Sequence, residues 1–200
     1  MRGRPPHIRE DVILDAARDV FLAEGLATTT AKIADRAGVS EGILFYRYKT
    51  KEALLAAVIA RETRIPADVL AIAETAGKVD LATNLERIMF TIIRSMTTAH
   101  PFLLLAESSM SPAALRAALD AGAEPLPVRD VKLISSYLRA EMQLGRIRRV
   151  RPEPAARAIF GACIDHVRSR SNTSVAADRA FVRSVVDLLL NGLNKPKLRK

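Results

Sequence analysis

The sequence predicts an all-α protein, and three observations lead to this prediction. Apolar residues recur with a helical period near the N-terminus, where Ile13, Ala16, Ala17, Val20 and Phe21 occupy positions i, i+3, i+4, i+7 and i+8. Prolines and glycines divide the 200-residue chain into segments of helical length. The alternation of apolar and polar residues that a half-buried strand requires is absent. From the segment lengths we expect about nine helices.

The composition is that of a soluble protein with one or two domains. Hydrophobic residues make up 49% of the chain, which is enough for a buried core. The longest apolar run, residues 53–60, is far shorter than the roughly 20 residues of a membrane span. Glu10 and Asp11 follow the basic start of the chain where a signal peptide would have its apolar stretch. We therefore expect a cytoplasmic protein with no membrane partner.

The net charge of +9 favours a polyanionic partner, either nucleic acid or an acidic membrane surface. Cys163 is the sole cysteine, which excludes an intrachain disulfide and a thiolate metal cluster, and we interpret it as a small buried hydrophobe. The three histidines are far apart in the sequence, and the chain has no H-E-x-x-H, G-x-S-x-G or glycine-rich phosphate loop. We expect no enzyme activity, no metal and no cofactor.

Residues 30–45 have the features of a helix-turn-helix. Ala34 is a small residue suited to close packing of the two helices, and Gly38 tolerates the positive φ of the turn. Ser40 is a good N-cap for the second helix, which we expect from Ser40 to about Tyr46, and Thr30 can cap the first. The alternative is an ordinary helical hairpin, which seldom combines a capping serine after Gly-Val with a basic and aromatic segment after the second helix.

The segment after the second helix, residues 45–55, adds a second recognisable pattern. Residues 9–60 resemble the DNA-binding domain of the TetR family. The matching motifs are Phe-x-x-x-Gly at residues 21–25, a Thr-Thr pair, Ile-Ala-x-x-Ala-Gly-Val-Ser-x-Gly at residues 33–42, and Lys-x-x-Leu at residues 51–54. The chain departs from the family pattern at Phe45, where a tyrosine is usual, and at Tyr48, where a phenylalanine is usual. Tyr46 can supply the hydroxyl that Phe45 lacks, and we expect Tyr48 to pack beneath the helices.

The resemblance implies that the short second helix enters the major groove of DNA. Ile43 can contact a thymine methyl group, and Gly42 allows close approach of the backbone. Glu41 can accept a hydrogen bond from cytosine or complement the helix dipole, and both interpretations fit the sequence. The candidate phosphate contacts are Thr28, Thr29, Thr30, Tyr46, Arg47 and Lys51, with a solvated charge as the alternative for Arg47. The full set of predicted DNA-binding residues is Arg2, Arg4, Thr28, Thr29, Thr30, Ser40, Glu41, Gly42, Ile43, Phe45, Tyr46, Arg47 and Lys51.

Arg2 and Arg4 belong to a separate basic arm, residues 1–8. The run Arg-Gly-Arg-Pro is flat and narrow enough for an A·T-rich minor groove, whose potential attracts arginine. A disordered basic tail is the alternative. A second basic tail, residues 195–200, ends the chain.

Residues 65–194 are expected to form a helical domain for ligand binding and dimerisation, after a DNA-binding domain at residues 9–64. Methionine and aromatic side chains suit an adaptable apolar pocket, although core packing is the alternative for each one. The candidate pocket residues are Phe90, Ile93, Met96, Phe102, Leu105, Met110, Tyr137 and Phe160. The basic segment 146–151 is either a solvated loop or a feature that favours an anionic effector.

Helices are expected at about residues 154–169 and 176–190. The resemblance implies that such a pair forms a four-helix interface with its copy in a homodimer. The candidate interface residues are Ile159, Cys163, Val167, Phe181, Val185, Leu188 and Leu189, with packing in the chain's own core as the alternative. Dimerisation would let two recognition helices bind a palindrome.

The sequence thus favours a ligand-responsive repressor that a small apolar effector releases from double-stranded DNA. A regulator of the same fold that activates, or that has no ligand, is the main alternative. A helical enzyme and a basic protein that binds anionic membranes are further alternatives. The absence of paired acid-base or metal residues argues against the enzyme, and the helix-turn-helix argues against the membrane protein.

Overall fold

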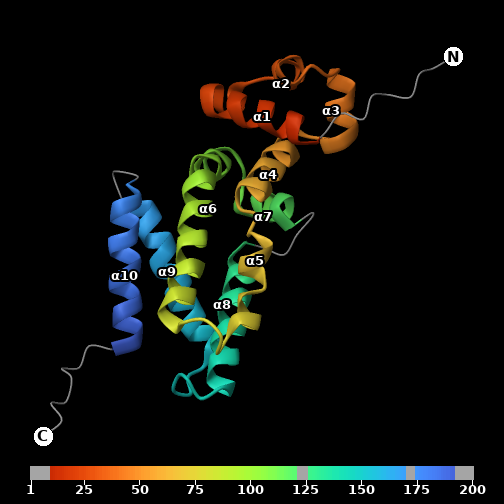
Figure 1. Cartoon of the computed structure of the whole chain (residues 1–200). Coiled ribbons are helices and arrows are strands. Elements are labelled where there is room, and N and C mark those ends of the chain that lie inside the picture. Colours follow the sequence, from red (N-terminus) through yellow and green to blue (C-terminus); the bar gives the residue numbers. More distant parts are fainter. Residues whose placement is uncertain (1–9, 121–125, 170–173, 192–200) are drawn as a thin grey trace, which may run out of the picture. The chain divides into compact units, whose positions relative to one another are not determined.

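The computed structural model describes residues 10–120, 126–169 and 174–191 (Figure 1). Within these ranges the chain forms ten α-helices and two short 3-10 helices, with no β-strand. The predicted all-α class is therefore confirmed. The chain divides into two compact units, one made of residues 1–62 and 99–125 and the other of residues 63–98 and 126–200. We describe each by itself.

The first unit is built around α1 (Glu10–Glu24), α2 (Thr30–Ala37), α3 (Glu41–Tyr48) and α4 (Lys51–Glu62), with a 3-10 turn at Gly25–Ala27. Helix α1 packs against α2 and α4, and α3 packs against α2 and α4. The apolar stripe predicted on α1 faces this core, since Ile13, Ala17 and Phe21 are buried. Helix α7 (Pro112–Asp120) also belongs to this unit and packs against α4. The predicted domains, residues 9–64 and 65–194, are two contiguous segments, so they do not place α7 in the same unit as α1 to α4.

Gly38 makes the turn between α2 and α3, with a φ of +64° in the left-handed region. Its N–H donates to the carbonyl of Asp35 at 3.0 Å, and the N–H of Val39 donates to the carbonyl of Ala34 at 2.9 Å. This pair of bonds is the Schellman motif, which satisfies the last carbonyls of a helix and reverses the chain sharply. The predicted turn at Gly38 is confirmed.

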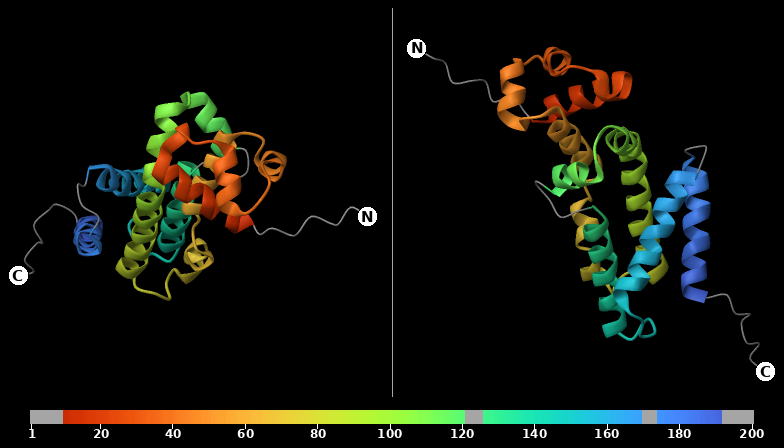
Figure 2. Two further views of the ribbon diagram at one scale, coloured as in Figure 1. Left: turned by 90° about the horizontal axis from the view of Figure 1, so that it is seen from above. Right: turned by 180° about the vertical axis from the view of Figure 1, so that it is seen from behind.

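The second unit contains α5 (Ala67–Leu70), the 3-10 helix Ile72–Thr75, the first part of α6 (Leu81–Ser109), α8 (Leu126–Gln143), α9 (Pro152–Ser169) and α10 (Val175–Asn191). Helices α8 and α9 pack along each other, and α9 and α10 lie side by side in both views of Figure 2. The His166 ring of α9 stacks on Phe181 of α10, with centroids 4.0 Å apart. The predicted bounds of these last two helices differ by at most two residues from the observed ones.

Helix α6 is continuous through Pro101, so the expectation that prolines separate the helices is wrong here. Proline cannot donate a backbone hydrogen bond, which weakens the helix at that turn. Packing on both sides of Pro101 supports the helix, since Ala99 before it and Phe102 and Ala106 after it are buried. By length and composition α6 is also the one described helix that could cross a membrane. Its apolar face, which includes Ile88, is buried in the second unit, as in the core helix of a soluble protein.

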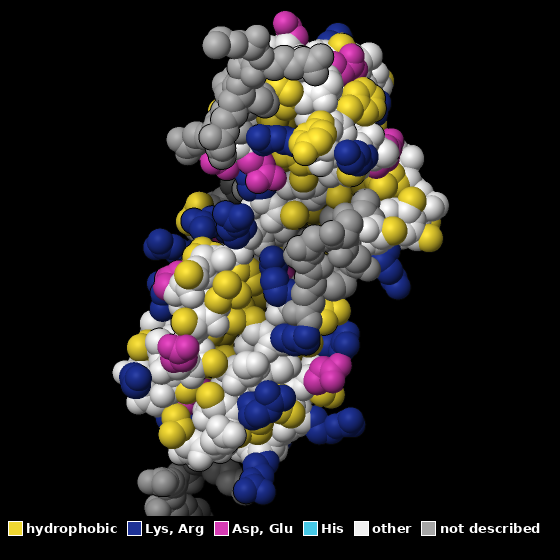
Figure 3. Space-filling view, turned by 90° about the vertical axis from the view of Figure 1, so that its right-hand side faces the viewer, with side chains coloured by type: hydrophobic (Ala, Val, Ile, Leu, Met, Phe, Trp, Pro, Cys, Tyr) yellow, Lys and Arg dark blue, Asp and Glu magenta, His cyan; other side chains and the backbone are white. Residues whose placement is uncertain are grey.

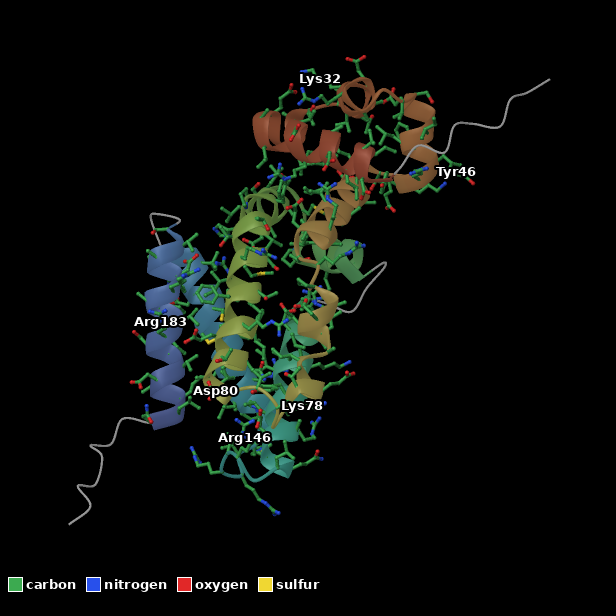
Figure 4. All side chains as sticks on the ribbon, viewed as in Figure 1. Lys32, Tyr46, Lys78, Asp80, Arg146 and Arg183 are labelled. Carbon is green, nitrogen blue, oxygen red and sulfur yellow. The ribbon has the colours of Figure 1, made fainter. Side chains whose placement is uncertain are left out.

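Arg146, the first residue of the basic segment 146–151, has a structural role. Its guanidinium donates to the carbonyl of Val79 at 3.1 Å and pairs with the buried carboxylate of Glu141 at 3.3 Å. Figure 4 shows it next to Lys78 and Asp80, which precede α6. Arg146 therefore ties the loop after α8 to the loop before α6.

Replacing Gly38 with alanine is expected to destabilise the protein by about 1 kcal/mol, because an L-residue is strained at positive φ. A Cβ atom at Gly38 would meet nothing within 4 Å, so the cost comes from the backbone alone. The matched control is Gly42→Ala inside α3, where alanine should stabilise the helix by about 0.5 kcal/mol. Urea unfolding measures both. Two changes of the same sign would contradict the assigned conformations.

Candidate nucleic-acid interface

Helix α3 has one buried side and one exposed side. Leu44 is 2% exposed and anchors the helix, while Tyr48, one turn later, is half-buried. On the opposite side Phe45 is 50% exposed and Tyr46 is 79% exposed. Figure 4 shows the Tyr46 side chain directed away from the helices of its unit. These two neighbouring aromatic rings form a small exposed apolar surface that is available for contact.

Basic residues flank this aromatic pair. Arg47 and Lys49 are both exposed, and the Lys49 Nζ atom lies 5.2 Å from the centroid of the Tyr46 ring. Lys49 has a φ of +61°, which is uncommon for a residue with a side chain, and it ends the helix by donating its N–H to the carbonyl of Phe45 at 3.0 Å. Figure 3 views the side where α3 lies and shows hydrophobic side chains between lysine and arginine side chains there. A surface with cations around exposed rings suits a phosphate backbone.

The threonines before α2 have different roles. Thr29 is the N-cap, accepting a hydrogen bond from the Lys32 N–H at 3.3 Å, so the cap expected at Thr30 is one residue earlier. Thr30 instead donates to Glu41 Oε1, which links the start of α2 to the start of α3. Thr28 is 3% exposed, so its hydroxyl is not available at the surface for the predicted phosphate contact.

The start of α3 matches the prediction in position but not in detail. Ser40 occupies the N-cap, yet its side chain makes no capping hydrogen bond. Gly42 is exposed, and a Cβ atom there would meet only Ser40 Oγ, at 3.8 Å. Ile43 is half-buried. Glu41 complements the helix start and is held by Thr30, so its carboxylate is already positioned.

Lys51 holds the loop before α2 in place. Its ammonium donates to the carbonyl oxygens of Leu26 and Thr28, the latter at 2.9 Å. The sequence analysis predicted that this ammonium group contacts a DNA phosphate. In the structure it is partly buried, and its hydrogen bonds go to the two carbonyls instead. Lys51 thus positions the segment that leads into the helix-turn-helix.

Tyr48 packs beneath the helices as expected, and its hydroxyl donates to Glu10 Oε1 at 3.4 Å. Burial, with the nearby Glu10 carboxylate, raises the pKa of Tyr48 to about 12. The Tyr48 hydroxyl therefore stays protonated, and its hydrogen bond to Glu10 joins the end of α3 to the start of α1. Arg2 and Arg4 lie outside the described residues, so the minor-groove arm stays a prediction.

The eight predicted pocket residues lie in different parts of the described structure. Ile93, Met96 and Tyr137 are buried in the core of the second unit, and Phe160 packs against that core. Phe102, Leu105 and Met110 belong to the other unit. Phe90 alone lines the groove found in the second unit, whose other walls come from α5 and the start of α10. The sequence pattern missed this groove because much of its lining is polar and comes from three separate segments.

The predicted dimer residues also divide into two groups. Ile159, Cys163 and Val167 are buried in their own core, so this face of α9 is not available to a partner. Burial raises the pKa of the Cys163 thiol to about 12, which agrees with its interpretation as a buried hydrophobe. Phe181 and Val185 pack against the same core. Leu188 and Leu189 are each 43% exposed and remain available.

Helices α2 and α3, joined by a left-handed glycine turn and carrying an exposed aromatic and basic face, define a helix-turn-helix DNA-binding protein. The family model of the bacterial regulatory proteins of the tetR family matches residues 13–58, which include the whole motif. Residues 13–58 of this chain therefore match the DNA-binding domain of that family.

Solved structures of this family share the fold over nearly the whole chain. PfmR, a TetR family transcriptional regulator from Thermus thermophilus, is 24% identical, with a TM-score of 0.63 over 92% of this chain and 99% of that chain. FadR from Bacillus subtilis, solved in complex with stearoyl-CoA, is 20% identical, with a TM-score of 0.67 over 93% of this chain and 100% of that chain.

A third similar structure is NalD, the secondary repressor of the MexAB-OprM multidrug efflux pump in Pseudomonas aeruginosa. It is 19% identical, with a TM-score of 0.64 over 93% of this chain and 96% of that chain. No curated protein sequence matches the chain. At these identities the similar structures establish the fold.

Replacing Lys51 with methionine is expected to destabilise the protein by roughly 1–3 kcal/mol, because two partly buried carbonyl groups lose their donor. The matched control is Lys32→Met, which removes only the exposed pair with Glu24 and should cost less than about 1 kcal/mol. Urea unfolding compares the two variants. Equal losses would contradict the structural role of Lys51.

Proposed function

We propose that this protein is a TetR-family repressor that binds a palindromic operator as a homodimer and is released by a small-molecule effector. The observation that carries the proposal is the exposed face of α3, where Gly42, Phe45 and Tyr46 lie on a helix anchored by the buried Leu44. The similar protein NalD is a repressor, which supports the same sign of regulation for this chain.

In this proposal α3 enters the major groove with its N-terminal end leading. Gly42 allows the backbone to approach the bases, and Ile43 contacts a thymine methyl group. Phe45 and Tyr46 lie against the sugar-phosphate backbone, with the Tyr46 hydroxyl, Arg47 and Lys49 as phosphate contacts. Lys49 replaces Lys51 in this role, since the Lys51 ammonium is bonded to backbone carbonyls.

The start of α2 supplies further phosphate contacts in the proposed complex. The first backbone N–H groups of a helix have no partner within it, and a phosphate can accept from them. The Thr29 hydroxyl is exposed beside these groups, and Thr30 is half-exposed. The hydrogen bond between Thr30 and Glu41 would hold the starts of α2 and α3 together, so that both face the same stretch of the DNA backbone.

The homodimer is proposed to form through the outer face of α10. Leu188, Leu189 and Leu190 are consecutive leucines that are each at least 40% exposed, whereas Val182 and Val186 on the same helix are buried. Consecutive exposed leucines on a soluble protein favour burial against a partner. A second copy is the occupant that a palindromic operator requires, because each recognition helix reads one half-site.

The effector is proposed to bind in the second unit. The similar protein FadR was solved with stearoyl-CoA, and this supports a small-molecule effector for a protein of the same fold. A regulator without a ligand, or an activator, is the second candidate and would have the same DNA-binding surface. Operator binding of this kind would take place in the cytoplasm.

Selection from randomised duplex DNA is expected to recover a palindrome with two half-sites. Against that operator, Tyr46→Ala and Gly42→Ala should each weaken binding about tenfold, since they remove a phosphate contact and block close backbone approach. Gly42→Ala is expected to stabilise the fold, so its loss of binding would not reflect unfolding. The control is Leu22→Ala, another exposed apolar residue of the same unit, which should bind normally. Salt-sensitive binding without a preferred sequence would contradict specific readout.

The double variant Leu188→Glu/Leu189→Glu is expected to be monomeric in sedimentation experiments at concentrations where the natural protein is dimeric. Charges buried without partners in the interface would oppose association. The control is Leu144→Glu, which is also an exposed leucine of the second unit and should leave the dimer intact. A double variant that still forms dimers would exclude this face of α10.

A further inference from the structure

The second unit contains a groove of about 570 Å³ along α6, at the edge of the core. Its floor is formed by residues of α6, with α5 on one wall and the start of α10 on another. Its volume falls within the range of about 300–1,000 Å³ that is typical of small-molecule sites. The apolar part of the lining consists of Pro66, Val69, Phe90 and Val175.

Charged side chains line the same groove, and most of them are paired. Asp68 of α5 forms an ion pair with Arg87 of α6, and the Arg87 hydrogen bond holds the pKa of Asp68 below its usual value. Asp178 of α10 lies 2.9 Å from His166 Nε2, which is itself stacked on Phe181. Both carboxylates are therefore held by neighbouring side chains in the walls.

Arg94 differs from these residues. Its side chain is exposed and lines the groove. It lies on the same face of α6 as Arg87, two helical turns further along. Among the residues that the structure describes, it has no ion pair and no side-chain hydrogen bond. A guanidinium has five N–H donors and is charged at all physiological pH values, so it retains its full capacity for an anion.

The threonines of the groove do not compete with Arg94 as donors. Thr91 donates its hydroxyl proton to the carbonyl of Arg87 at 2.9 Å, and Thr98 donates to the carbonyl of Ser95 at 3.0 Å. Thr97 donates in the same way to the carbonyl of Ile93 at 2.6 Å. Each hydroxyl has one proton, which is used within the helix, so the groove presents these oxygens as acceptors.

We propose that this groove binds a small amphipathic organic anion, with its anionic head on Arg94 and its apolar body against Phe90, Val69 and Val175. This inference rests on the proposed function, because it names the chemistry of the effector. The head is a carboxylate, sulfate or phosphate, which a guanidinium binds with two parallel hydrogen bonds. The body lies along α6, where the stripe from Arg87 to Thr98 is roughly 16 Å long.

The occupant is a single soluble molecule rather than a membrane surface. A groove of this size holds one small ligand. Phe90 lies in the floor of the groove and is half-buried, so a flat bilayer would not reach it. Charge and shape together therefore select an anion with a short apolar tail.

The test is calorimetric titration of the full-length protein with decanoate and with decanol, which share a tail and differ in the head. Decanoate should bind at least tenfold more tightly than decanol. Arg94→Gln should weaken decanoate binding about tenfold without changing decanol binding, and Arg94→Lys should retain part of the preference. The matched control is Arg148→Gln, an exposed arginine of the same unit outside the groove, which should bind both ligands normally.

A second variant tests the apolar part of the site. Phe90→Ala should weaken decanoate and decanol binding alike, because both tails lose the same ring. Decanoate binding that is unchanged in Arg94→Gln would overturn the proposal, as would co-sedimentation with phosphatidylglycerol vesicles that depends on Arg94. Thermal unfolding of each variant confirms that the fold is intact.

Operator affinity measured with and without decanoate separates this inference from the proposed function. If decanoate binds through Arg94 and the operator affinity does not change, the groove is a site but its ligand is not the effector. If another small molecule releases the operator and decanoate does not bind, the groove assignment is wrong and the ligand-responsive repressor stands.

Discussion

The left-handed turn at Gly38 is the constraint on which the DNA-binding surface depends. Two backbone hydrogen bonds close α2 at this point and direct the chain into α3 within three residues. Leu44 then packs into the core, and this fixes which side of α3 faces outward. The Thr30–Glu41 bond and the two bonds of Lys51 hold the segments on either side of the turn. Readout of bases needs such rigid placement, because small displacements cost a large part of the binding energy.

The second unit uses the two faces of α6 for different purposes. One face supplies Ile88, Met89 and Ile92 to the core, where they are almost fully buried. The other carries Arg87, Thr91 and Arg94 and forms the floor of the groove. A ligand in the proposed site would therefore contact the same helix that supplies these core residues.

The surfaces proposed for partners are those where the chain violates the ordinary rule of apolar residues inside. Tyr46 on α3 and Leu188 and Leu189 on α10 are all exposed in the single chain. The groove adds Arg94, a cation without a carboxylate partner among the described residues. The proposed contacts with DNA, a second copy and a ligand would each cover one of these surfaces.

The sequence by itself predicted the all-α class, the glycine turn and the helix-turn-helix region, but not that α6 continues through Pro101. The predicted features are local, since period, caps and turn residues act over a few positions, and the bounds of α9 and α10 followed within two residues. Only the tertiary structure decided which partner each face meets. A helical period shows that Ile159, Cys163 and Val167 share a face, but not that their own core covers it. In the same way, Lys51 binds carbonyls 23 and 25 residues earlier in the chain, and the groove is formed by three separate segments. The sequence did not predict these contacts because long-range packing leaves no periodic signal in it.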